Sequence, residues 1–187
     1  MITSAIQRSN KMPFPRALKQ TCFIAGGILA LILTSDTVYA VMMKNDPNGF
    51  DGIPWGTRLS ESDRFKKVED TGRSRTYEPK TDPPTLGTVP VESMKFTTFG
   101  DKFARVTVRY KGKATHEQIL PYLQSLYGPL DRIPGQFSVG PVKFYSWQGF
   151  DTEVTLRFEV PTDRGIIFIE SQTLRLSNTE GNSGTVF

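Results

Sequence analysis

The stretch that decides the fold most clearly is residues 94–110, with the sequence MKFTTFGDKFARVTVRY. Two runs rich in β-branched and aromatic residues, Met94–Phe99 and Lys102–Tyr110, flank the dipeptide Gly100-Asp101. Glycine and aspartate tolerate the positive φ angles of a primed turn, which matches the twist of paired strands. The stretch therefore predicts a tight β-hairpin.

Further strands are expected on both sides of this hairpin. In residues 152–160 apolar and polar side chains alternate, a period that buries one face of a strand and leaves the other in water. Strands are predicted at Ser74–Glu78, Val142–Trp147, Thr152–Val160 and Ile166–Ser171.

Two helices are also predicted. Ser60 and Asp63 are suited to start one that runs to about Val68. The second is expected over His116–Tyr127, because Thr115 begins a capping-box spacing and a Gly-Pro pair follows the last residue. Its apolar stripe consists of Ile119, Leu120, Leu123, Leu126 and Tyr127.

The order of these elements, helix then strands then helix then strands, indicates the α+β class. We expect a twisted antiparallel sheet with two helices on one face. A tandem duplication of an α-β-β-β unit would give the same order, but no sequence identity between the halves supports it, so both origins stay open. One α+β domain is expected over residues 49–176, with a polar leader at 41–48 and a flexible tail at 177–187.

The first forty residues have the features of an export signal. Arg8, Lys11, Arg16 and Lys19 form a positive region before the apolar run at 23–33, and Val38-Tyr39-Ala40 provides a cleavage site. A membrane-spanning helix needs about 20 apolar residues, so a cleaved signal is favoured over an uncleaved anchor. Either Met1 or Met12 can be the start. The sequence predicts a bacterial periplasmic or secreted protein.

Removal of this segment changes the charge and the cysteine content. Four of the 23 basic and one of the 19 acidic residues lie in it, which leaves 19 basic and 18 acidic residues, a net charge of +1. Nucleic acid is therefore excluded as a general electrostatic partner. The single cysteine, Cys22, is removed as well, so the mature chain offers neither a disulfide nor a thiolate ligand. Cys22 precedes the apolar run, which argues against a lipoprotein.

The segment Gly49–Thr57, with the sequence GFDGIPWGT, carries a resemblance. It resembles the start of small, uncharacterised exported bacterial proteins that open with a Phe-x-Gly-Ile-x-Trp-Gly pattern. The general plan is also similar to that of BamE-like and β-lactamase-inhibitor-like envelope modules. These resemblances imply a small envelope domain and bring no activity with them.

Two groups of residues are candidate binding surfaces. The basic residues Lys102, Arg105, Arg109, Lys111 and Lys113 occur within a stretch free of acids and are a candidate anion-binding strip, in which Arg105 and Arg109 share one strand face. The alternative is a solvated face neutralised by Glu153 and Glu159. Phe50 and Trp55 are expected to close the edge of the core, and an exposed aromatic binding patch is the alternative.

Catalytic patterns are scarce. His116, the only histidine, is expected to be exposed and inert in the first turn of its helix. Asp151 and Glu153 are the best local carboxylate pair, and both are expected on a solvated surface. The terminal Phe187 does not indicate an outer-membrane barrel, because the preceding residues lack strand alternation.

The sequence thus predicts an exported, non-enzymatic envelope protein that binds another envelope component, without cofactor or metal. The expected partner is an envelope protein, with anionic lipid or cell-wall polymer as alternatives. The alternative function is an enzyme of unrecognised type, such as a carboxylate-dependent hydrolase.

Overall fold

The computed structural model describes residues 40–130 and 135–180. The chain divides into the units Met1–Asp36 and Thr37–Phe187, and every described residue belongs to the second unit. The predicted signal up to residue 39 and the tail from residue 181, with Phe187, lie outside the described residues. Within the described ranges, no helix combines the length and the apolar character needed to cross a membrane.

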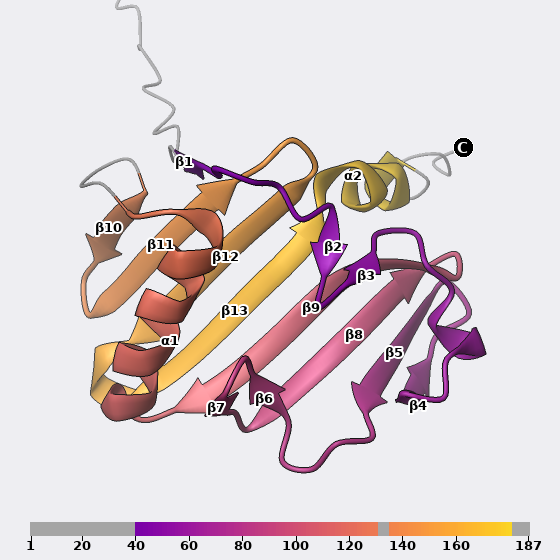
Figure 1. Cartoon of the computed structure of the whole chain (residues 1–187), viewed down its shortest axis with the longest axis horizontal. Helices are drawn as coiled ribbons and strands as arrows, with labels where there is room; N and C mark the ends of the chain where they lie inside the picture. Colours follow the sequence, from indigo (N-terminus) through magenta and orange to yellow (C-terminus); the bar gives the residue numbers. More distant parts are fainter. Residues whose placement is uncertain (1–39, 131–134, 181–187) are drawn as a thin grey trace, which may run out of the picture. The chain divides into compact units, whose positions relative to one another are not determined.

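Nine strands of the described chain form one large sheet (Figure 1). Its neighbours pair antiparallel, apart from β1, which runs parallel to β11 at one edge. In spatial order the strands are β1 (Val41–Met42), β11 (Val142–Gln148), β12 (Thr152–Glu159), β13 (Arg164–Ser171), β9 (Lys102–Lys111), β8 (Ser93–Phe99), β5 (Ser74–Pro79) and β4 (Phe65–Asp70), and β10 (Gln136–Val139) also pairs with β11.

Two short ribbons and two helices accompany this sheet in the described ranges. The ribbons are β2 (Gly49–Phe50) with β3 (Ile53–Pro54), and β6 (Thr85–Leu86) with β7 (Val89–Pro90). The helices are α1 (Lys113–Tyr127) and α2 (Gln172–Glu180), and single 3₁₀ turns occupy Leu59–Glu61 and Val160–Thr162.

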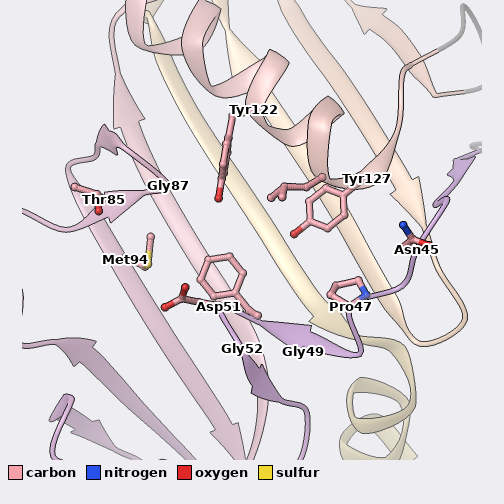
Figure 2. A pocket seen from close by; sticks show the side chains of 12 residues that line it. Asn45, Pro47, Gly49, Asp51, Gly52, Thr85, Gly87, Met94, Tyr122 and Tyr127 are labelled. Atoms are coloured by element: carbon pink, nitrogen blue, oxygen red, sulfur yellow. The ribbon is translucent and has the colours of Figure 1, made fainter.

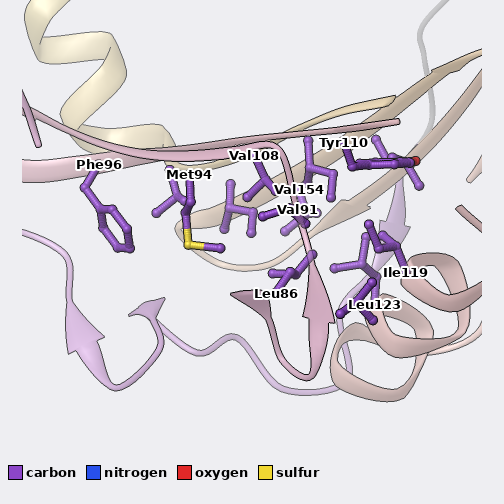
Figure 3. Packing of buried hydrophobic residues seen from close by; sticks show 14 of the residues in the cluster. Leu86, Val91, Met94, Phe96, Val108, Tyr110, Ile119, Leu123 and Val154 are labelled. Atoms are coloured by element: carbon purple, nitrogen blue, oxygen red, sulfur yellow. The ribbon is translucent and has the colours of Figure 1, made fainter. Parts of the chain in front are cut away.

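The core lies on the face of the sheet that α1 covers (Figure 3). Alternation along β12 turns Val154 and Leu156 to this face, where both are buried. The buried side chains of α1 recur every three to four residues and form one stripe toward the sheet: His116, Ile119, Leu123 and Tyr127. Burying one such large apolar side chain stabilises the fold by about 1.5–3 kcal/mol, so the packing of α1 against the sheet is a major source of stability.

The predicted hairpin at residues 94–110 is confirmed. Gly100 and Asp101 have φ angles of 53° and 67°, both in the left-handed region that a primed turn requires. β8 and β9 pair antiparallel around this turn. The predicted strands at 74–78, 142–147, 152–160 and 166–171 correspond to β5, β11, β12 and β13, with ends that differ by one or two residues.

The predicted fold class, an α+β domain whose twisted antiparallel sheet carries two helices on one face, is wrong. Strands dominate, and only α1 packs on the core face. In Figure 3 the pale yellow α2 lies on the opposite side of the sheet. There, its Arg175 forms ion pairs with Glu153 and Glu170, which point away from the core.

The helix predicted from Ser60 to Val68 is also wrong. A 3₁₀ turn at Leu59–Glu61 is followed by β4, which pairs antiparallel with β5. The hydrogen bonds between these strands outweigh the weak local preference of the segment for a helix. Because no first helix forms among the described residues, the α-β-β-β duplication has no structural counterpart.

Candidate functional site

A cavity of about 490 Å³ opens on the core side of the sheet, between α1 and the two ribbons (Figure 2). Its lining combines apolar side chains with a few polar groups, as small-ligand sites in proteins usually do. Six side chains that face it come from β8, α1 and the β2–β3 turn: Met94, Tyr122, Leu126, Tyr127, Phe50 and Asp51.

The β2–β3 ribbon forms one side of the cavity, and its backbone conformation requires glycine at positions 49 and 52. Asp51 and Gly52, with φ angles of 50° and 72°, form its two-residue turn. Gly49 has no room for a Cβ atom, because the carbonyl oxygen of Ile53 occupies that position. The Gly-Phe-Asp-Gly-Ile sequence thus holds Phe50 and Asp51 beside α1.

Two tyrosine hydroxyls of α1 face the cavity in Figure 2. Burial raises the pKa of Tyr122 above its usual value, and the negative charge of Asp51 adds to the effect. Burial also raises the pKa of Tyr127, which is 4% exposed. Both phenols are therefore neutral donors at physiological pH. Among the described residues, the buried side-chain polar atom without a hydrogen-bond partner is Gln172 Nε2, so neither tyrosine hydroxyl is a buried group without a partner.

Asp51 provides the charge of this site. Its carboxylate accepts a hydrogen bond from Arg64 Nη2 at 2.8 Å, and the two side chains are 63% and 61% exposed. Arg64 does not line the cavity, and neither does any other basic side chain of the described residues. The cavity therefore joins an apolar surface to two phenol hydroxyls, the side chains of Asn45 and Thr85, and one carboxylate.

The prediction that His116 is exposed is wrong, since the side chain is buried in the core. Its Nδ1 lies 2.7 Å from the hydroxyl of Tyr110, and its ring stacks on Phe158 with centroids 4.0 Å apart. Burial, assisted by the positive charge of Lys143, lowers the pKa of His116 to about 4. The imidazole is therefore neutral at pH 7 and serves packing. Gly112, not Thr115, caps α1, so the helix begins at Lys113 and His116 falls on its buried stripe.

The two carboxylates expected on a solvated surface are both engaged. Asp151 accepts hydrogen bonds from the Ser171 hydroxyl at 2.8 Å and from the Thr173 backbone N–H at 2.9 Å, which fixes the start of α2. Glu153 pairs with Arg175 of α2 at 3.1 Å. No group of three or more His, Cys, Asp or Glu side chains suited to a metal occurs in residues 40–130 and 135–180.

Arg105 of the predicted basic strip belongs to a structural network. Its Nε donates to Glu170 at 2.6 Å, and its guanidinium lies 5.9 and 6.0 Å from the centroids of two phenylalanine rings. Glu170, rather than the expected Glu153 or Glu159, therefore neutralises this arginine. Glu170 also accepts from Arg175 at 2.6 Å, so the same carboxylate fastens α2 to the sheet.

The other four residues of the strip do not form one surface. Lys113 pairs with Glu117 at 3.7 Å. Lys102 lies at the β8–β9 turn, whereas Arg109 and Lys111 lie toward the far end of β9, and all three are exposed. Arg109 lines a hollow of about 190 Å³ that contains acidic as well as basic side chains. The structure thus gives little support to a continuous anion site.

The aromatic pair is separated as well. Phe50 lines the cavity and contacts Phe96 edge-on at 5.9 Å between centroids. Trp55 packs on Phe103 at 4.8 Å, and its Nε1 donates to the Thr152 hydroxyl at 3.0 Å. Both side chains are half-buried against the core, and they do not form a shared patch.

Sequence reasoning missed Tyr122, Tyr127 and Asp51 as site residues. Tyr127 was assigned to the apolar stripe of its helix, and Tyr122 lay beside that stripe. The available signal is the position of Tyr122, an aromatic residue one helical turn before Leu126 and beside the predicted stripe. Neither a protein-family model, nor a curated protein, nor a solved structure matches this chain.

Proposed function

We propose that the protein is an exported, non-enzymatic module of the bacterial envelope that binds a partner protein through the cavity beside α1. The observation that carries this proposal is the cavity itself, in which the hydroxyls of Tyr122 and Tyr127 and the carboxylate of Asp51 stand beside apolar side chains. Such a combination of apolar surface and a few polar groups is typical of sites that bind another molecule. A bound group that accepts a hydrogen bond from Tyr127 would replace water there.

The export part of the proposal rests on the charged and apolar segments of residues 1–40. The partner is placed in the envelope because an exported chain meets its partners there. The cavity volume falls in the range in which proteins bind small ligands or short protruding segments.

The alternative function, a carboxylate-dependent hydrolase, has less support from the cavity. Acid–base hydrolysis by carboxylates uses two acidic groups at the reacting bond. Asp51 is the single carboxylate among the described residues that line the cavity. Asp151 and Glu153 are engaged in holding α2.

The test compares a cavity-filling variant with a matched control. Leu126→Trp places a large ring at the cavity, and Leu176→Trp places the same ring on α2, outside it; the two leucines are 44% and 57% exposed. Each protein is cross-linked in envelope extracts, and co-purified proteins are quantified by mass spectrometry. Wild type and Leu176→Trp should enrich the same partner, and Leu126→Trp should lose it.

Two results would overturn the proposal. Equal recovery of the partner by all three proteins would show that the cavity is not the binding site. Recovery of no partner by any of them would remove the support for a protein-binding module. Melting temperatures of the variants, measured by circular dichroism, separate loss of binding from loss of fold.

A further inference from the structure

We infer that the cavity receives a short protein segment that presents a lysine or arginine side chain beside an apolar one. This inference rests on the proposed function and adds the chemistry of the bound segment. Three features of the lining support it: the sign of its charge, its aromatic and hydroxyl groups, and its apolar surface.

The charge of the cavity is complementary to a cation. Asp51 contributes a carboxylate, and no basic residue of the described chain lines the space. Arg64 approaches Asp51 from a neighbouring hollow, and their pair is exposed on both sides. An exposed ion pair of this kind contributes little to stability. A second cation can therefore bind the Asp51 carboxylate from the cavity side. An anionic segment would meet the Asp51 carboxylate with no basic side chain of the described chain on the cavity side to pair with.

Aromatic rings and hydroxyls surround the position that a cationic head would take. Phe50 of β2 and Tyr122 of α1 both line the same space. Their ring faces attract ammonium and guanidinium groups. The hydroxyls of Tyr122 and Tyr127 can accept a hydrogen bond from the cation and donate one to a backbone carbonyl of the segment.

The apolar part of the lining suits the stem of a long basic side chain. Met94 is buried below the cavity, and Leu126 stands at its edge. Lysine and arginine pack their methylene groups on such surfaces while the charged head stays at a polar group. At about 490 Å³ the cavity is larger than one side chain, which leaves room for an apolar neighbour.

The test uses four peptides of the form acetyl-Leu-X-Leu-amide, in which X is lysine, arginine, norleucine or glutamate. Norleucine matches the lysine stem without its charge. Binding to the mature protein is measured by NMR titration. The lysine and arginine peptides should bind about five- to tenfold tighter than the norleucine peptide, and the glutamate peptide should bind weakest.

Three variants assign this preference to the cavity. Asp51→Asn should reduce the affinity for the lysine peptide to that for norleucine, because asparagine keeps the positive φ but not the charge. Asp63→Asn removes an exposed charge outside the cavity and should keep the preference. Tyr127→Phe should weaken all four peptides by removing the hydroxyl.

The outcomes separate the inference from the proposed function. Equal affinities for the lysine, norleucine and glutamate peptides would overturn the inference that the bound segment is cationic. If Leu126→Trp still loses the partner in that case, the cavity remains the binding site of the proposed function. Lysine preference that persists in Asp51→Asn would overturn the role of the carboxylate. If the peptides bind as expected but Leu126→Trp still captures the partner, the proposed function is wrong. The cavity would then bind cationic segments without being the site of the partner protein.

Discussion

Acidification should remove a defined share of the stability of this protein through His116, the single histidine of the chain. In the folded protein its pKa is about 4, against 6.5 for a free imidazole, because burial and then Lys143 disfavour the charged ring. The unfolded chain binds a proton below pH 6.5, whereas the folded chain does so only near pH 4. The stability contribution is therefore complete above pH 6.5 and is lost as the pH falls toward 4.

The magnitude follows from this difference in pKa. Each unit corresponds to about 1.4 kcal/mol, so the shift from 6.5 to about 4 gives about 3.5 kcal/mol as an upper value. The part due to Lys143 is reduced by solvent, because that side chain is exposed. We expect a loss of about 2–3 kcal/mol between pH 6.5 and pH 4 from this residue alone.

The assay compares wild type with the double variant His116→Phe/Tyr110→Phe. The variant removes the titrating ring together with the hydroxyl that bonds to it, and both phenylalanine rings can still pack beside Phe158. Urea denaturation, followed by tryptophan fluorescence, gives the free energy of unfolding at steps from pH 7.5 to 3.5. Carboxylates titrate in both proteins. The difference between the two curves of unfolding free energy against pH therefore isolates the contribution of His116. Parallel curves would refute the reasoning that a buried, neutral imidazole resists protonation.

Four further predictions concern other parts of the chain. Mass spectrometry of the exported protein should find Val41 as the first residue, and full-length chain in the membrane fraction would contradict cleavage. Trp55→Ala should lower the free energy of unfolding by about 3 kcal/mol in urea denaturation, because the ring packing and the hydrogen bond to Thr152 are lost. An unchanged urea midpoint would contradict this packing role. Asp46→Ala should cost about 2 kcal/mol, because its carboxylate accepts three hydrogen bonds from residues 151 and 152. Arg105→Gln should lower the free energy of unfolding by about 1–2 kcal/mol, and Arg109→Gln should hardly change it. Equal melting temperatures of the two variants would show that the ion pair between Arg105 and Glu170 contributes no stability.

The strands could be predicted because their signals are local. The hairpin at 94–110 contains both strands and the turn that joins them, so its register follows from neighbouring residues. The segment 65–70 lacks such a signal, since only Phe65 of it is buried. Its strand state comes from pairing with β5, a tertiary effect that overrides local propensity.

The position of His116 was predictable in principle. It lies three residues before Ile119 and continues the stripe that Leu123 and Tyr127 form. The capping-box spacing at Thr115 suggested a later helix start, and this error moved His116 from the buried face to the first turn. The helix start at Gly112, with a φ angle of 102°, left no such side-chain signal in the sequence.

The cavity could not be predicted from sequence spacing, because it joins parts of the chain that no local rule connects. Asp51 belongs to one ribbon and Gly87 to another, and Tyr122 comes from α1. A Cβ atom on Gly87 would lie 2.7 Å from the ring of Tyr122, so this close approach depends on packing between distant segments. The same holds for the pairing of Arg105 with Glu170 across two strands.

On the proposed export, the hydrogen bonds of Asp46 to Asp151 and Thr152 have a consequence for the order in which the chain folds. Burial alone would raise the pKa of Asp46, but its hydrogen bonds to Thr152 and Asp151 lower it to about 2, so the leader is held by a charged acceptor at every physiological pH. The bond between Asp46 and the backbone of Asp151 joins residues 105 positions apart. Contacts of such long sequence separation close late, because the entropy of loop closure must be overcome first. A chain that emerges from a membrane channel with its N-terminus first would therefore keep its leader undocked until Asp151 and Thr152 have appeared. Until then the edge of β11 that β1 covers would be free to pair with other strands. A chaperone that binds exposed strand edges could bind there during this time.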